Sequence, residues 1–199
     1  MSMKLSPRFT LSLLLLATLH LSACAPQMKS YADPNFHRTD YKDVVTSSAP
    51  MPVRVEVQFQ RDGKPREQSA GVLRTHVERT LIASGAFAPD LNATSLLRVV
   101  VNNVTDRATA RKVGVVTGLS FGLSGGIVTD EYQFNIVYTD AEGSKKDGFY
   151  RHAMHTAVGD VPLPQGFAPL KPADAFSKIV EDAVLNFVQQ YQSEQTQPG

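Results

Sequence analysis

The stretch Met51 to Gln60, MPVRVEVQFQ, decides the fold class, because apolar and polar side chains alternate along it. Such alternation is typical of a strand with one buried and one exposed face. A turn at Asp62-Gly63 follows, and apolar residues then recur at helical spacing from Ala70 to Leu81. Gly85 marks the end of this helix, since glycine readily adopts the left-handed conformation that stops helices. The sequence therefore predicts a strand followed by a helix.

Two further elements complete the expected order. Leu96 to Val104 is apolar on both faces over much of its length, which indicates a central strand. From Phe176 to Tyr191, apolar residues form one stripe opposite charged and amide residues. This stripe predicts an amphipathic helix that packs on a sheet, or alternatively one that binds a partner. We expect an α+β fold in which a mostly antiparallel sheet of about four to five strands carries two helices on one face.

The stretch Val113 to Val128, VGVVTGLSFGLSGGIV, has three interpretations. Two overlapping matches to the hydrolase motif G-x-S-x-G are centred on Ser120 and Ser124. No helix is expected after either match, although the catalytic elbow requires one. A glycine-lined helix is disfavoured, because each interior glycine costs about 1 kcal/mol relative to alanine. Its sixteen residues would also rise only about 24 Å, less than the ~30 Å hydrocarbon core of a membrane.

The third interpretation, a β-hairpin, is favoured by the period of the sequence. Most odd positions from Val113 are apolar, and most even positions carry glycine or serine. A two-residue turn at Gly125-Gly126 would fold this arm back onto the strand that runs to Thr139. The expected pairs are Leu119 with Tyr132, Thr117 with Phe134, Val115 with Ile136 and Val113 with Tyr138. A third arm is expected from Gly148 to about Ala157.

The tip of this expected hairpin is a candidate contact site. Phe121, Leu123, Ile127 and Val128 are apolar and would mark a membrane or partner contact if the tip is exposed, or core if a helix covers it. Arg107, Arg111 and Lys112 precede the hairpin, either as a solvated loop or as a contact for phosphates of lipid headgroups or lipopolysaccharide.

The sequence predicts neither a catalytic residue nor a metal ligand. A hydrolase would need Asp130 or Asp140, followed by His152 or His155, beside its serine. Residues three apart on a strand point to opposite faces, so the two histidines cannot bind one metal ion together. A cluster of cysteine or carboxylate ligands and a phosphate-binding glycine loop are also lacking. We therefore expect a protein that is not an enzyme and uses no cofactor.

The chain begins with a secretory leader, in which two basic residues precede the apolar run from Phe9 to Leu21. The leader ends in Leu-Ser-Ala-Cys, with Cys24 the single cysteine of the chain. This ending resembles the lipobox of bacterial lipoproteins, which implies cleavage after residue 23 and lipidation of Cys24 with three acyl chains. Ala25 stands where aspartate retains some lipoproteins at the inner membrane, so the resemblance implies sorting to the outer membrane. The alternative is an ordinary cleaved leader followed by a free thiol.

The expected organisation has four parts. Residues 1–23 are the leader, 24–50 the lipidated cysteine and a flexible tether, 51–191 a single domain, and 192–199 a polar tail. Without the leader, 18 basic residues face 19 acidic ones, and this balance argues against a nucleic-acid partner.

These features predict a non-enzymatic adaptor or binding module in the cell envelope. It would be held on the outer membrane by its lipid, face the periplasm, and bind an envelope protein through a sheet edge or the hairpin tip. The alternatives are a subunit of an oligomeric outer-membrane pore or secretion assembly, and a small hydrolase. In element order and size, the chain is similar to the lipopolysaccharide-assembly lipoprotein of the outer membrane, although no motif is shared.

Overall fold

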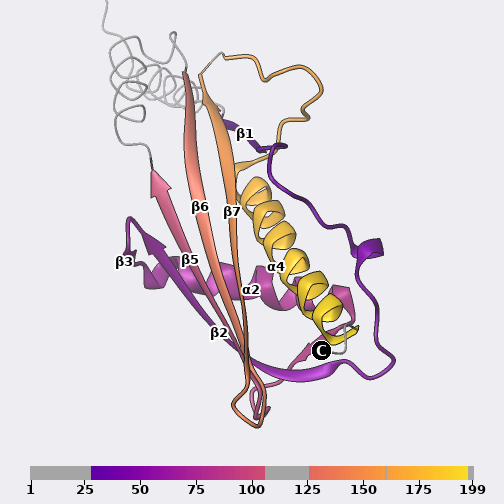
Figure 1. The fold of residues 1–199 in the computed structure, drawn as a ribbon. Helices are drawn as coiled ribbons and strands as arrows, with labels where there is room; N and C mark the ends of the chain where they lie inside the picture. The colour runs from indigo at the N-terminus through magenta and orange to yellow at the C-terminus, as the bar shows by residue number, and fades with distance from the viewer. Residues whose placement is uncertain (1–27, 106–125, 160, 197–199) are drawn as a thin grey trace, which may run out of the picture.

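The computed structural model describes residues 28–105, 126–159 and 161–196. In this part of the chain, one sheet carries two helices on one face (Figure 1). The strands are β1 (Met28–Ala32), β2 (Met51–Arg61), β3 (Lys64–Pro65), β4 (Phe87–Pro89), β5 (Leu96–Thr105), β6 (Gly126–Thr139) and β7 (Lys145–Val158). The helices are α2 (Glu67–Ser84) and α4 (Pro172–Thr196), with a short 3-10 helix, η1 (Tyr41–Asp43). The predicted α+β class is confirmed.

The strand order is β1-β7-β6-β5-β2-β3, and β4 also pairs with β2. β2 and β5 run parallel because α2 connects them. The pairs β5 with β6, β6 with β7 and β7 with β1 are antiparallel. The central position predicted for 96–104 is confirmed, since β5 lies between β2 and β6. The sheet exceeds the expected four to five strands because β1, β3 and β4 are short segments without a clear alternating pattern.

The core lies between the sheet and the two helices. α2 buries Leu73, Val77 and Leu81, which recur at a spacing of four residues, and it ends at Gly85 with a left-handed φ of 67°. α4 buries the predicted apolar stripe against the same sheet face. The largest fully buried side chains include Phe87, Phe134 and Phe187. Both predicted helices are therefore present and cover one face of the sheet.

The pairing predicted for the arm 113–124 is wrong. Residues 130–139 of β6 have β5 on one edge and β7 on the other, so neither edge is free for a further strand. Phe134, for example, lies between Val101 of β5 and Tyr150 of β7. The alternation in β6 shows which face is buried but not which strand is the neighbour, and β5 carries a matching pattern. Residues 106–125, with most of the expected hairpin, lie outside the described residues.

Residues 28–50 differ from the flexible tether expected there. β1 pairs antiparallel with β7, and the side chains of Tyr31 and Val44 are buried. We call residues 33–46 the strap, because this segment runs from β1 along α4, as Figure 1 shows. Thr39 in the strap donates a hydrogen bond to Asn186 of α4. The polar tail is also shorter than expected, since α4 continues to Thr196.

Candidate functional site

Most of the contact residues predicted from the sequence lie outside the described residues. These are Arg107, Arg111, Lys112, Phe121 and Leu123; the predicted lipidation site Cys24 and the serines of the hydrolase motif, Ser120 and Ser124, also lie outside them. Ile127 and Val128 lie at the start of β6, where they are partly buried opposite Ala157 and Thr156 of β7. These two predicted contact residues are therefore strand residues within the pairing of β6 with β7.

The two histidines of β7 form separate pairs with aspartates that sequence reasoning missed. His152 is 2% exposed, and its Nε2 lies 3.3 Å from Oδ2 of Asp182 in α4. His155 lies on the opposite face of the sheet, with its Nε2 3.2 Å from Oδ2 of Asp33 and its Nδ1 2.9 Å from Oγ1 of Thr129. Both aspartates are distant in sequence from their histidines, so no local motif could have revealed them.

These pairs hold the N-terminal segment onto the domain. Asp182 also lies 3.4 Å from Nε of Arg38, and the ring of Phe36 stacks on His152 at a centroid distance of 5.2 Å. Burial raises the pKa of Asp33, but hydrogen bonds from the Asn35 backbone and from His155 outweigh this effect and hold its pKa below the ordinary value. The part of the chain that the structure describes contains no group of three or more potential metal-ligating residues.

The outer edge of β2 is the candidate functional site, because it is paired only at its two ends. β4 pairs with residues 51–53 and β3 with residues 60–61, while β5 occupies the other edge. The N–H of Arg54 donates to Ser95 next to β5, so even-numbered residues of β2 face β5 and odd-numbered residues face outward. The backbone N–H and C=O groups of Val55 and Val57 therefore point to the outer edge.

Arg74 of α2 divides this edge into two cavities. Its Nη1 donates to the backbone C=O of Val55 at 2.6 Å and lies 3.2 Å from Oε1 of Glu78. The carbonyl of Val55 is thus occupied, whereas the outward groups of Val57 lie beyond Arg74. Partial protection of this kind is common on exposed strands, because unpaired edges otherwise promote aggregation.

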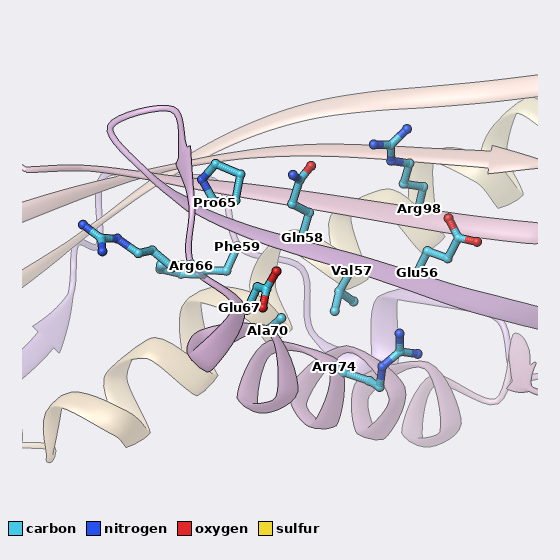
Figure 2. A pocket seen from close by; sticks show the side chains of 10 residues that line it. All are labelled: Glu56, Val57, Gln58, Phe59, Pro65, Arg66, Glu67, Ala70, Arg74 and Arg98. Atoms are coloured by element: carbon cyan, nitrogen blue, oxygen red, sulfur yellow. The ribbon is translucent and has the colours of Figure 1, made fainter.

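The first cavity lies between β2 and the start of α2 and has a volume of about 380 Å³. Figure 2 shows Val57 pointing from β2 toward α2, where Ala70 and Arg74 project from the helix. Phe59 and Pro65 add further apolar surface to its lining. The rim is charged and is formed by Glu56, Arg66, Glu67 and Arg98. This cavity combines an apolar floor with outward backbone groups.

The second cavity continues along the same edge toward β4 and has a volume of about 520 Å³. It is lined by Arg54, Val55, Pro89, Asp90 and Leu91, with Arg74 and Glu78 on the helix side. Leu91 is 80% exposed, so an apolar side chain stands at the far end of the edge. We call the outer edge of β2 at residues 54–59, with these two cavities, the β2 groove.

The β2 groove has the features that proteins use to bind an extended peptide. A peptide strand added to a sheet edge gains main-chain hydrogen bonds from the edge and places alternate side chains into adjacent pockets. The sequence predicted the strand 51–60, but not which of its edges would stay open, since that depends on where β3, β4 and β5 pair.

Comparisons with known proteins identify no family for this chain. No protein-family model and no curated relative matches it. Among solved structures, it is similar to a PelC dodecamer from Paraburkholderia phytofirmans, with 14% identity, a TM-score of 0.35, and coverage of 83% of this chain and 98% of that one. It is also similar to a minor lipoprotein from Acinetobacter baumannii, with 14% identity, a TM-score of 0.33, and coverage of 74% and 90%. Similarities at this level carry no argument about function.

Proposed function

We propose that the protein is a lipid-anchored lipoprotein of the bacterial cell envelope whose domain acts as a non-enzymatic adaptor. Attachment at Cys24 and sorting to the outer membrane are supported by the sequence Leu-Ser-Ala-Cys and by Ala25. None of the described helices is long and apolar enough to cross a membrane. The observation that carries the adaptor role is the β2 groove, a strand edge that the rest of the sheet leaves open.

In this function, an extended segment of a periplasmic protein binds along the β2 groove. The gap between β4 and β3 spans residues 54–59, but the C=O of Phe59 already accepts the N–H of Arg66, so the free edge at residues 54–58 has room for about five residues of a partner, or about 16 Å of strand. The outward N–H and C=O of Val57 would pair with the backbone of the partner. An apolar side chain of the partner would enter the cavity between Val57 and Ala70. A contact of this length is small, which fits a transient adaptor.

The adaptor role is tested by photocrosslinking in cells. A photoreactive residue replaces Ala70 inside the groove, and the control replaces Val72, which is 52% exposed on another side of α2. We expect a discrete protein adduct from position 70 that is absent from position 72. Val57→Pro should abolish this adduct because it removes the outward N–H, whereas Val57→Ala should retain it. An adduct that persists in the proline variant, or its absence from the native chain, would contradict the groove as the binding site.

The lipid anchor is tested separately with Cys24→Ser. Metabolic labelling with a radioactive fatty acid should label the native chain and not the variant, and fractionation should move the variant from the outer membrane to the soluble periplasm. Equal labelling of both chains would contradict lipidation at Cys24. The alternative role as a pore subunit depends on residues 113–125, which lie outside the described residues, and a detergent-stable ring in gel filtration would support it.

A further inference from the structure

The N-terminal half of β7 forms a second open edge, at the opposite end of the strand order from the β2 groove. β1 pairs with residues 154–158 of β7, and the N–H of Asp33 donates to the C=O of Ala153 at 2.9 Å. Residues 145–152 have no strand partner on this edge in the part of the chain that the structure describes. The C=O of Asp147 accepts a side-chain hydrogen bond of 3.3 Å from Gln190 of α4, which a pairing strand would displace. The bond to Ala153 shows that odd-numbered residues of β7 direct their backbone groups outward. Phe149 and Arg151 are the outward residues at the centre of the open segment.

The side chains along this edge are exposed on the face of the sheet opposite the helices. Phe149 is 61% exposed on the face opposite the helices. Asp147 lies two residues before Phe149, is exposed, and forms no ion pair with any described side chain. Arg151, two residues after it, lies 3.1 Å from Glu131 and is 57% exposed. A cavity of about 590 Å³ adjoins the edge between β7 and the outer side of α4. An acidic, an aromatic and a basic side chain therefore follow one another on one face.

We propose that this edge pairs with the same edge of a second copy of the chain, antiparallel and with a two-fold axis at Phe149. In this register, Asp147 faces the partner's Arg151, Phe149 faces the partner's Phe149, and Arg151 faces the partner's Asp147. Odd-numbered residues then lie opposite odd-numbered residues, which is the arrangement in which both exchange backbone hydrogen bonds. The order acidic, aromatic, basic becomes complementary to itself when one copy is reversed.

Other registers are less favourable. A shift of two residues in one direction would place Lys145 opposite the partner's Arg151, so that like charges face each other. A shift of two residues in the other direction would place Asp147 opposite the partner's Ala153 and Arg151 opposite the partner's Phe149, so that neither charge faces an opposite charge. A shift of one residue would place outward-facing backbone groups of one copy opposite residues whose backbone groups face β6 in the other copy, so that hydrogen bonds could not form. The symmetric register is the one that uses the open edge and pairs its charges.

The two open edges suit different occupants. β3 and β4 close both ends of the β2 groove, so the long β7 strand of a folded copy cannot enter it. The β7 edge is bounded by a strand at one end only, and it suits a folded copy. This inference does not depend on the proposed adaptor function, and it would leave the β2 groove of each copy free. The dimer would place the centres of the two β1 strands about 48 Å apart along the strand direction, because the centre of β1 lies opposite Thr156.

Oligomeric state is the test, measured by native mass spectrometry of the full chain in detergent over a range of concentrations. We expect a dimer whose affinity Asp147→Arg lowers by at least about tenfold. In that variant, an arginine at position 147 of each copy would face the partner's Arg151, so that like charges meet twice in the interface. Arg151→Asp should weaken it similarly, and the double variant Asp147→Arg, Arg151→Asp should recover most of the affinity. Melting curves of each variant verify folding. Asp147 and Arg151 are both exposed, so neither substitution removes a buried side chain.

Two substitutions of exposed apolar residues by aspartate, one at the proposed interface and one away from it, complete the experiment. Phe149→Asp should weaken the dimer, whereas Ile82→Asp should leave it intact, because Ile82 is similarly exposed at 64% but lies on α2. A monomeric native chain at every concentration would overturn the proposal. So would a dimer that these variants leave unchanged, or a double variant that remains folded and as weak as the single ones.

Discussion

Asp182 is a charged side chain that is 1% exposed and lies close to three basic groups. Its carboxylate is 3.3 Å from His152, 3.4 Å from Arg38 and 3.8 Å from Lys178. A buried carboxylate is tolerated only when it is paired and hydrogen-bonded, so this cluster fixes how the strap, β7 and α4 meet.

Removing Asp182 should therefore be costly. We expect Asp182→Ala to lower the free energy of unfolding by about 2–4 kcal/mol, because His152 would lose its buried partner. Lys178→Ala should cost less than about 1 kcal/mol, since Lys178 is 35% exposed and its pairing is screened by water. Urea unfolding followed by circular dichroism measures both values. Equal losses in the two variants would contradict the role assigned to Asp182.

Asp33 should make stability depend on pH in the acidic range. Its pKa lies below the ordinary value of 3.8, so the ionised form is favoured by folding. This contribution is fully present above pH 3.8 and is lost as the pH falls through the lower pKa of the folded state. Asp33→Asn should therefore be less stable than the native chain at neutral pH, and the difference should shrink in acid. Unfolding curves recorded from pH 7 to about pH 2 test this, and a constant difference would contradict it.

Two glycines in regular elements should respond oppositely to the same change. Gly71 lies in α2, where an added Cβ would meet no atom within 4 Å. We expect Gly71→Ala to raise the free energy of unfolding by about 0.5–1 kcal/mol, because alanine favours the helix and has fewer conformations to lose. Thermal unfolding by calorimetry measures the change. A lower melting temperature would show that Gly71 has a packing role absent from the described contacts.

Gly148 is the opposite case, in β7. An added Cβ would lie 2.7 Å from the ring of Tyr150 and closer still to its hydroxyl, which donates a hydrogen bond to Gln190 of α4. Gly148→Ala should lower the free energy of unfolding by about 1–3 kcal/mol, because the Tyr150 ring must shift and its hydrogen bond to Gln190 is then disturbed. The double variant Gly148→Ala, Tyr150→Leu should lose less stability than the two single changes added together. Full additivity would show that the two residues do not interact.

At the scale of the whole molecule, the strap and β1 are part of the domain. Ser30 bonds to Thr156 at 2.8 Å, and Val45 exchanges hydrogen bonds with Gln192 of α4. A chain that lacks residues 28–46 should lose its cooperative thermal transition, because buried surfaces of β7 and α4 would be exposed. Differential scanning calorimetry would detect this loss. An unchanged transition would instead support a flexible tether across these residues.

The candidate site was predicted only in general terms. A sheet edge was expected as one possible contact, and the strand 51–60 that contains it was located from its alternation. The cavity residues Ala70 and Arg74 come from a helix that was also located. Their meeting at the outer edge of β2 could not be predicted, because it depends on β3 and β4 pairing only with the ends of that strand.

The sequence by itself determined the main strands, both long helices, the buried face of the strand 51–60 and of each helix, and the α+β class, because apolar periodicity is a local property of the chain. Only the tertiary structure decided that β6 lies between β5 and β7, that β1 and the strap join the domain, and that His152 and His155 pair with Asp182 and Asp33. Periodicity shows which face of a strand is buried, but it does not show which segment lies beside it. Strand neighbours and edges depend on contacts between residues far apart in the chain, and these also create the β2 groove and the open edge of β7.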